Sequence, residues 1–213
     1  MLQILMENAF FIVISKPSGI SVHNDDDSVA VWLQKQNKPG HFVNRLDRET
    51  SGLMIVALKP EFHEPLASAI NDGQKIYRAL LCGAWKNPKV SKVEWSWPLT
   101  DQAEGYKNVQ GEKAGQKTCL SLAELQRNNA YFSEVLIELK TGRQHQIRRH
   151  AVLSGQAIAG DNRYGNQKHN EKLAQIYKQS PLRLQLHAEQ LKFKFDGIDQ
   201  DFSDKNFSLE QFF

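Results

Sequence analysis

A charged segment that runs directly into an apolar stretch is the first place where these residues could do chemistry. Residues 44–52 (N-R-L-D-R-E-T-S-G) precede residues 53–58, whose length and composition predict a buried strand. Polar side chains beside a core strand are costly unless they line a cleft or pair with one another. Asp47 lies between Arg45 and Arg48, and a carboxylate between two cations should stay ionised. It is therefore suited to act as a nucleophile or a base, although a charged turn with a local ion pair would use the same residues.

A second polar segment, residues 141–150 (T-G-R-Q-H-Q-I-R-R-H), has the spacing of a helix start. Thr141 followed by Gln144 is a capping box, which predicts a helix from there to Gly155. On a helical period Arg148 shares a face with small apolar residues, while Arg149 points elsewhere. A half-buried arginine usually has a carboxylate partner, and Asp47 is the natural candidate.

The same region is locally basic. Residues 140–150 contain four Lys or Arg residues, two histidines and no acid, beside a predicted helix N-terminus. This pattern favours contacts to phosphate groups, with Arg143 and His145 as candidate RNA-binding residues. A solvated basic helix with one structural ion pair is the alternative.

One aromatic residue is a third candidate. Tyr77 is the third residue of K-I-Y-R-A at residues 75–79, in a predicted strand whose alternate side chains face the core. Such a tyrosine is a core residue by default. An aromatic ring opposite a carboxylate can instead stack on a base or a sugar.

Several other chemistries lack their residues. The sequence contains no G-x-x-x-x-G-K-[ST], G-x-G-x-x-G or G-x-S-x-G motif. His145 and His150 are five residues apart without the glutamate of H-E-x-x-H, which argues against a zinc protease. Asp47 and Glu49 are too close in sequence to be the obvious carboxylate pair of a glycoside hydrolase.

The elements that must position these residues are mostly strands. Apolar alternation and turn residues predict strands at residues 10–15, 53–58, 75–83, 90–97, 118–125, 131–140, 184–188 and 191–195. Helices are predicted at residues 28–36, 60–72, 141–155 and 171–178. This order indicates an α+β fold with a mixed, mostly antiparallel central sheet and flanking helices. Residues 100–115 should form a surface loop, and the tail from residue 196 should fray or pack back through its phenylalanines.

Composition is that of an ordinary globular protein. The 213 residues have 40% hydrophobic content and a net charge of +3, and this length and composition predict a single domain. The sequence shows no Pro/Gly/Ser-rich linker. Cys82 and Cys119 are far apart and form no metal-binding pair, so both should be reduced thiols in a cytoplasmic protein.

Five stretches in one order resemble the RluA-type pseudouridine synthases. Residues 44–53 are similar to that family's H-R-L-D-x-x-T-S-G-L motif, and residues 141–150 to T-G-R-x-H-Q-I-R-x-H. The others are K-P-S-G at residues 16–19, K-I-Y-R-A at residues 75–79, and G-D-x-x-Y-G at residues 160–165 with L-H-A at residues 186–188. The resemblance covers about residues 8–195 and implies a single pseudouridine synthase-like catalytic domain with its core there. We expect no separate N-terminal RNA-binding domain of the kind that many members of this family carry.

The resemblance also implies a reaction. A specific uridine in structured RNA, in a stem-loop of rRNA or tRNA, would be flipped out and isomerised to its C5-glycoside. The N-glycosidic bond breaks, uracil is retained and turned, and C5 joins C1′. Neither a metal nor a cofactor is needed, and we expect a cytoplasmic monomer.

Individual roles follow from the matching positions. Asp47 matches the catalytic aspartate, Tyr77 the ring that stacks on the target base, and Arg148 the arginine that pairs with the aspartate. Arg45 matches the residue that enters the RNA stack, and Leu186 an apolar wall of the pocket.

The sequence departs from the family pattern at Asn44, where the family usually has histidine. This puts in question a substrate contact or a hydrogen bond that holds the loop. Two alternatives remain open at this point: a binding module that remodels RNA without catalysis, and a nucleosidase acting on free uridine.

Overall fold

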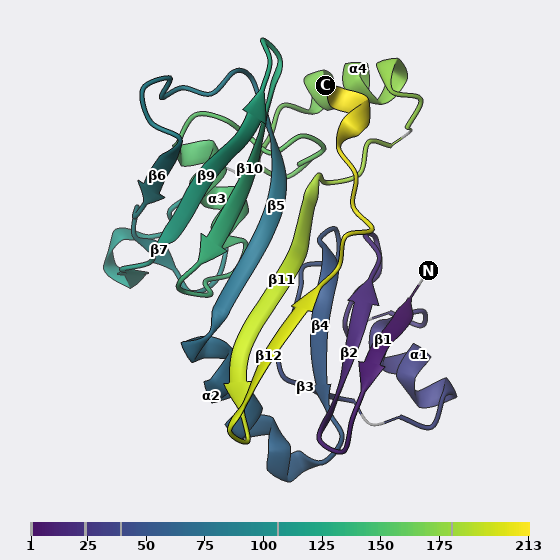
Figure 1. Cartoon of the computed structure of the whole chain (residues 1–213). Coiled ribbons are helices and arrows are strands. Elements are labelled where there is room, and N and C mark those ends of the chain that lie inside the picture. Colours follow the sequence, from purple (N-terminus) through teal and green to yellow (C-terminus); the bar gives the residue numbers. More distant parts are fainter. Residues whose placement is uncertain (1, 24, 39, 106, 180) are drawn as a thin grey trace. The chain divides into compact units, whose positions relative to one another are not determined.

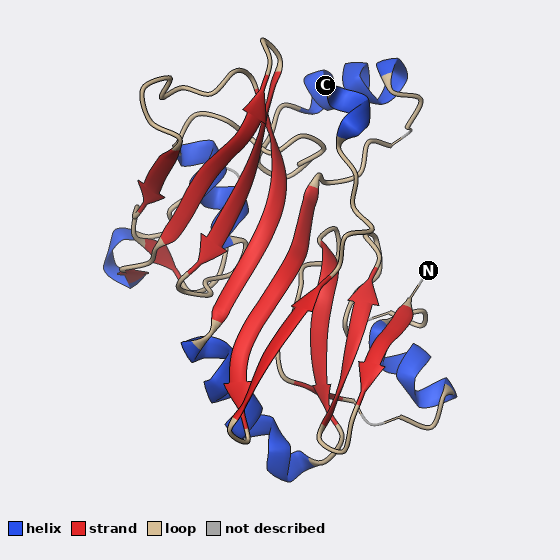
Figure 2. Ribbon diagram, viewed as in Figure 1, coloured by secondary structure: helices blue, strands red, loops and turns tan. Residues whose placement is uncertain are grey.

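The computed structural model of the chain contains two compact units. It describes residues 2–23, 25–38, 40–105, 107–179 and 181–213. Unit 1 is Met1–Lys75 with His187–Phe207, and unit 2 is Ile76–Leu186 with Ser208–Phe213. The chain passes between the units inside β5 (Gln74–Cys82), at the start of β11 (Leu186–Phe195) and after Phe207. Figures 1 and 2 show the elements. The expectation of a single domain stays a prediction, and each unit is described by itself.

Unit 1 is built on a mostly antiparallel sheet. Its strands besides β11 are β1 (Gln3–Glu7), β2 (Phe11–Lys16), β3 (His41–Phe42), β4 (Ser51–Ala57) and β12 (Ile198–Ser203). Strand β2 pairs with β1 and β4, and β11 forms an antiparallel hairpin with β12. A parallel pairing joins β4 to β11 at two positions, Ser51 with His187 and Gly52 with Ala188.

Two helices accompany this sheet. Helix α1 (Val29–Lys35) begins at the predicted N-cap, Ser28, whose hydroxyl accepts a hydrogen bond from the Val31 amide at 3.4 Å. A 3-10 turn, η1 (Pro60–Phe62), leads into α2 (His63–Asp72). The helix buries Leu66 and Ile70 against the sheet, as the predicted apolar face required.

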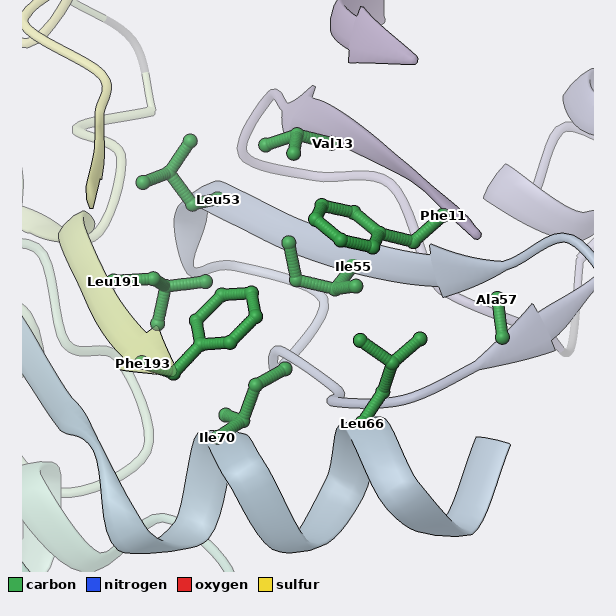
Figure 3. Close-up of a cluster of buried hydrophobic side chains, with 9 residues drawn as sticks. All are labelled: Phe11, Val13, Leu53, Ile55, Ala57, Leu66, Ile70, Leu191 and Phe193. Atoms are coloured by element: carbon green, nitrogen blue, oxygen red, sulfur yellow. The ribbon is translucent and has the colours of Figure 1, made fainter. Parts of the chain in front are cut away.

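The core of unit 1 lies between α2 and the sheet. Figure 3 shows its side chains pointing toward one another from β2, β4, α2 and β11: Phe11, Val13, Leu53, Ile55, Ala57, Leu66, Ile70, Leu191 and Phe193. All seven residues of β4 are buried. Each large side chain buried here contributes about 1.5–3 kcal/mol, so β4 is a rigid base for the segment that precedes it.

Unit 2 contains a second antiparallel array. Strand β5 pairs with β10 (Phe132–Leu139), β10 with β9 (Ser121–Asn128), and β9 with β6 (Lys92–Trp95). A separate short pair joins β7 (Leu99–Thr100) to β8 (Gln116–Lys117), which follows the 3-10 turn η2 (Lys113–Gly115). The helices are α3 (Gln146–Leu153), α4 (Gln167–Ile176) and the 3-10 turn η3 (Glu210–Phe212). The α+β class with mostly antiparallel pairing is confirmed.

The predicted capping box is wrong. Helix α3 begins at Gln146, and its N-cap is His145, which has a left-handed backbone with φ of 54°. The Thr141 hydroxyl is engaged elsewhere: it accepts a hydrogen bond from the Leu120 amide at 3.0 Å and donates to Gln146 Oε1 at 2.8 Å. The Leu120 amide, just before β9, occupies the threonine hydroxyl, and the N-cap of the helix lies four residues after Thr141.

The C-terminal part differs from the expected pair of short strands. Residues 184–188 and 191–195 contribute to one continuous strand, β11, and the unpredicted β12 pairs with it. The tail packs back, as one alternative expected. In unit 2 the Phe212 ring lies 5.3 Å from Phe132 and 4.5 Å from Tyr177. Within the described ranges, no helix is long and apolar enough to cross a membrane.

Candidate active site

A buried lysine holds residues 44–52, which we call the Asp47 segment. Lys16 is completely buried, and its ammonium donates hydrogen bonds to three backbone carbonyl oxygens: those of Pro17 at 3.0 Å, Ile20 at 2.8 Å and Arg48 at 3.0 Å. Burial lowers the Lys16 pKa to about 8, while the nearby negative charges of Asp47 and Glu49 act in the opposite direction. The lysine thus supplies both an anchor and a positive charge beside Asp47.

The turn that follows Lys16 is fastened to the same segment. The Gly19 amide donates to the Arg48 carbonyl oxygen at 2.8 Å, and Arg48 Nε donates to the Gly19 carbonyl oxygen at 3.0 Å. The Ser18 hydroxyl donates to the Glu49 carbonyl oxygen at 2.6 Å. Arg48 also lies 3.3 Å from a carboxylate oxygen of Asp25. Arg48 is therefore a structural residue of this turn, in agreement with its reading as part of a charged turn.

Asn44 performs the loop-holding function that the departure from histidine put in question. Its Oδ1 accepts a hydrogen bond from the Ile55 amide at 2.7 Å, and its Nδ2 donates to the Leu53 carbonyl oxygen at 3.4 Å. The side chain therefore mimics a strand partner for β4. With Lys16 on the other side, it fixes both ends of the segment that carries Arg45 and Asp47.

A buried histidine supports the end of this segment. His187 Nδ1 lies 2.9 Å from the Ser51 hydroxyl, and Nε2 lies 3.0 Å from the Asp204 backbone oxygen. The His187 ring stacks on Phe207 with centroids 5.0 Å apart. At Gly52, with φ of +118°, a Cβ atom would overlap the backbone of Ala188, so only glycine fits. The T-S-G and L-H-A motifs pointed to these residues, but nothing in the sequence paired them.

In unit 2, Arg148 has a carboxylate partner that sequence reasoning missed. Its Nε donates to Asp161 Oδ2 and its NH2 group to Oδ1, each at 2.9 Å. Arg148 is 3% exposed and Asp161 1% exposed. A half-buried arginine with a carboxylate partner was expected; Arg148 is more deeply buried than that, and a carboxylate partner is present. The pairing of Arg148 with Asp47, which belongs to unit 1, stays a prediction.

His145 belongs to the same cluster. Its Nδ1 lies 3.0 Å from the Tyr164 hydroxyl oxygen, and the Arg148 guanidinium carbon lies 5.4 Å from the Tyr164 ring centroid. Burial raises the Tyr164 pKa, so its hydroxyl stays protonated at neutral pH. The tyrosine therefore links the N-cap of α3 to the turn at residues 160–165.

The basic segment is less exposed than its composition suggests. Arg149 is completely buried, and its guanidinium donates to the carbonyl oxygens of Val109 at 2.5 Å and Thr100 at 2.9 Å. Arg143 forms an ion pair with Asp101 and keeps 29% side-chain exposure. The solvated basic helix is therefore wrong, because Arg148 and Arg149 are both interior. Arg143 and His145 remain the candidates of this segment for phosphate contact.

The remaining predicted residues are placed individually. Tyr77 lies in β5, 9% exposed and opposite Ile137 of β10, so the default expectation of a largely buried strand tyrosine holds. Leu186, the last residue of its segment in unit 2, is 3% exposed. Arg45 is exposed in unit 1. Their roles toward RNA stay predictions.

A buried histidine of α3, His150, connects this helix to Trp97 and Ser121. His150 Nε2 lies 3.0 Å from the Trp97 carbonyl oxygen and Nδ1 lies 3.1 Å from the Ser121 hydroxyl. Burial lowers the His150 pKa to about 4. Cys82 and Cys119 are free thiols, as predicted, and burial raises the pKa of both, that of Cys82 to about 11. None of the described residues forms a cluster of three or more metal-ligating side chains.

Comparison with solved structures identifies the fold. The chain superimposes on Human RNA Pseudouridylate Synthase Domain Containing 1 with a TM-score of 0.77 and 23% identity, covering 97% of this chain and 84% of that one. For Human RNA Pseudouridylate Synthase Domain Containing 4 the TM-score is 0.74 at 20% identity, covering 98% and 90%. The chain therefore has the fold of a pseudouridine synthase domain.

Comparison of sequences identifies the family. Residues 10–152 match the RNA pseudouridylate synthase family model. Ribosomal large subunit pseudouridine synthase C of Pasteurella multocida is 33% identical over 201 residues, covering 90% of this chain and 60% of the relative. The Escherichia coli protein of the same name is 32% identical over 205 residues, covering 92% and 63%. The chain belongs to the RNA pseudouridylate synthase family, which confirms the resemblance, and it spans about three fifths of the length of these relatives.

Proposed function

We propose that the chain is an RNA pseudouridine synthase that isomerises specific uridines in structured RNA. The observation that carries this proposal is the Asp47 segment, a motif of the family held by Lys16 and Asn44 in unit 1. Ribosomal RNA is the first substrate to test, because the curated relatives are named for the large ribosomal subunit. Transfer RNA is the second.

Two routes assign a role to the Asp47 carboxylate. On the first, it attacks the ribose at C1′ as the N1–C1′ bond breaks, uracil leaves with the electron pair, and the later attack of C5 on C1′ breaks the aspartate–C1′ bond. On the second, it removes a ribose proton as the N1–C1′ bond breaks and returns that proton when C5 bonds to C1′. On both routes the retained uracil turns before C5 bonds, and the C5 proton leaves while N1 gains a proton. Atoms and electrons balance without a redox partner, so the chemistry itself requires neither metal nor cofactor.

The other residues serve binding and orientation. In this proposal Arg148 pairs with Asp47, Tyr77 stacks on the extruded base, and Leu186 forms an apolar wall. Arg45 enters the RNA stack, since extrusion costs a few kcal/mol that stacking and phosphate contacts must offset. Arg143 and His145 contact the RNA backbone. A chain with this substrate acts in the cytoplasm, and we propose that it does so as a monomer.

The decisive experiment uses unmodified RNA made by transcription. Ribosomal RNA and tRNA are incubated with wild-type protein, Asp47→Asn, Asp47→Ala, and the control Asp27→Asn, which removes an exposed carboxylate of the same unit. Pseudouridine is then measured by mass spectrometry. We expect formation by the wild type and the control and none by either Asp47 variant. If neither RNA gains pseudouridine above the Asp47→Ala background, the proposal fails for these substrates.

Two further assays test the alternatives, one in a deletion strain and one with free uridine. A non-catalytic RNA-remodelling module would let Asp47→Ala fully complement a deletion strain. A nucleosidase would release uracil from free uridine. We expect neither result, because the remodelling role would not need the Asp47 carboxylate and the proposed reaction retains its base.

A further inference from the structure

The buried carboxylate of Asp161 accepts four hydrogen bonds, although the family motif assigns this residue no role. It accepts two hydrogen bonds from Arg148, as described above, and two more at Oδ1 from the backbone amides of Arg163 and Tyr164, each at 3.0 Å. All four donors belong to unit 2. The carboxylate therefore joins α3 to the turn at residues 160–165.

The turn itself has little freedom to move. The Gly160 amide donates to Asn170 Oδ1 at 3.1 Å, and Asn170 Nδ2 donates to the Asp161 carbonyl oxygen at 3.1 Å. The Gly165 amide donates to the same carbonyl oxygen at 2.9 Å. At Gly160, with φ of +77°, a Cβ atom would overlap the backbone of Arg183. The position of the Asp161 carboxylate is therefore fixed by backbone geometry rather than by a flexible side chain.

Stability alone does not explain this arrangement. A buried ion pair often contributes no more than well-packed apolar residues of the same volume, because both charges lose their hydration. What a bidentate carboxylate does provide is orientation: two parallel hydrogen bonds fix the plane of the guanidinium. The Tyr164 ring lies against Arg148 and adds a third constraint. Together, Asp161 and Tyr164 restrict rotation of the Arg148 guanidinium.

We propose that Asp161 is a positioning residue of the reaction, which fixes the guanidinium plane of Arg148 through its bidentate contact. This inference rests on the proposed function, in which Arg148 pairs with the catalytic aspartate. Asp161 does not touch the substrate; it acts through Arg148. Small misplacements in a reaction centre reduce rates by about 100-fold, which sets the expected effect.

The first test is Asp161→Asn, which keeps an oxygen for the backbone amides and removes the charge and one acceptor facing Arg148. We expect the single-turnover rate on transcribed ribosomal RNA to fall about 100-fold, with the Kd for the RNA changed less than about threefold. Asp161→Glu keeps the charge but shifts the carboxylate, and the rate should fall by at least about tenfold. It also serves if Asp161→Asn does not fold.

The matched control is Ser133→Ala. Ser133 is buried in unit 2, and its hydroxyl donates to the Gly83 carbonyl oxygen at 2.9 Å, outside the turn at residues 160–165. At an equal loss of melting temperature, Ser133→Ala should keep the rate within about fivefold of wild type. The proposal is overturned if Asp161→Asn stays within fivefold, or if Ser133→Ala loses as much activity as Asp161→Asn.

A double variant shows whether Asp161 acts through Arg148. Lysine cannot form the bidentate contact, so Arg148→Lys removes what Asp161 is proposed to position. The double variant Arg148→Lys with Asp161→Asn should then be no slower than Arg148→Lys alone. Multiplication of the two effects would mean that Asp161 acts independently, which contradicts the positioning role.

A measurement without RNA separates this proposal from the proposed function. In ¹⁵N NMR spectra the Arg148 Nε–H should give a slowly exchanging resonance in the wild type, which Asp161→Asn abolishes. A protected resonance in a wild type that modifies neither RNA overturns the proposed function and leaves the Asp161–Arg148 contact standing. If the wild type is active but its Arg148 Nε–H exchanges fast and gives no protected resonance, the positioning role alone is overturned.

Discussion

Replacing Lys16 with methionine tests whether a buried cation holds the Asp47 segment. The Lys16 ammonium is completely buried, and its pKa is lowered from 10.5 to about 8 by that burial. At neutral pH such a lowering corresponds to about 3 kcal/mol by which burial disfavours the charged form. The charge persists because three carbonyl oxygens need its donors. Burying the Lys16 charge therefore lowers the free energy of unfolding, while its hydrogen bonds fix the position of the Arg48 carbonyl group.

The cost has a definite pH dependence. An unfolded chain holds the lysine proton up to a pKa of 10.5, whereas the folded protein releases it near pH 8. Between these values the unfolded state binds more protons, so this group makes stability rise with pH. Integrated from pH 7 to pH 9.5, the wild type should gain about 2 kcal/mol relative to Lys16→Met, which has no titrating group there.

Urea unfolding at several pH values from 7 to 9.5 gives the difference in the free energy of unfolding between the wild type and Lys16→Met directly. Lys16→Arg is the control, because arginine stays charged throughout this range and should give the same pH-independent baseline as methionine. A difference that stays constant within about 0.5 kcal/mol would refute the argument that Lys16 is a buried, charged group. On transcribed ribosomal RNA, Lys16→Met should also reduce the single-turnover rate more than it weakens RNA binding, because the Arg48 carbonyl oxygen loses its anchor.

Three further substitutions test the supports of the site. Gly52→Ala should cost about 2–5 kcal/mol in urea unfolding, since φ is +118° and the new Cβ overlaps Ala188; a loss under 1 kcal/mol would contradict the close contact. The His150 pKa of about 4 lies below its ordinary 6.5, so the wild type should lose about 3 kcal/mol as pH falls from 6.5 to 4, and His150→Gln should lack that component. Asn44→Ala leaves the Ile55 amide without its 2.7 Å partner and should cost about 1–3 kcal/mol; an unchanged urea midpoint would count against this role.

The parts of the fold that the sequence predicted are those determined by local pattern. The apolar run after Gly52 is β4, buried at every position. Ser28 caps α1 as its residue type indicated, and the apolar spacing of α2 places Leu66 and Ile70 in the core. Strand alternation also predicted the β9–β10 hairpin, although β9 lies about three residues further along the chain. Periodicity and capping depend on neighbours in the chain, so a single sequence contains them.

The errors arise where a side chain is engaged by a distant residue. Thr141 has the spacing of a capping box, but the Leu120 amide occupies its hydroxyl. Arg149 adds to the apparent basic surface and is instead interior, bonded to Thr100. Asp161 stood in a recognised motif without an assigned role, because only the fold brings it to Arg148. In each case the spacing along the chain contained no signal of the partner.

Each unit buries a charged side chain next to a predicted site residue. In unit 1 the segment of a carboxylate, Asp47, is anchored by a buried cation, Lys16; in unit 2 a cation, Arg148, is anchored by a buried carboxylate, Asp161. Each supporting charge costs hydration free energy that apolar packing would not cost. Neither support can be replaced by an apolar residue without releasing the group it holds, because an apolar side chain offers no hydrogen bonds. The contacts of Lys16 and Asp161 therefore favour an orienting role for these buried charges over a purely stabilising one.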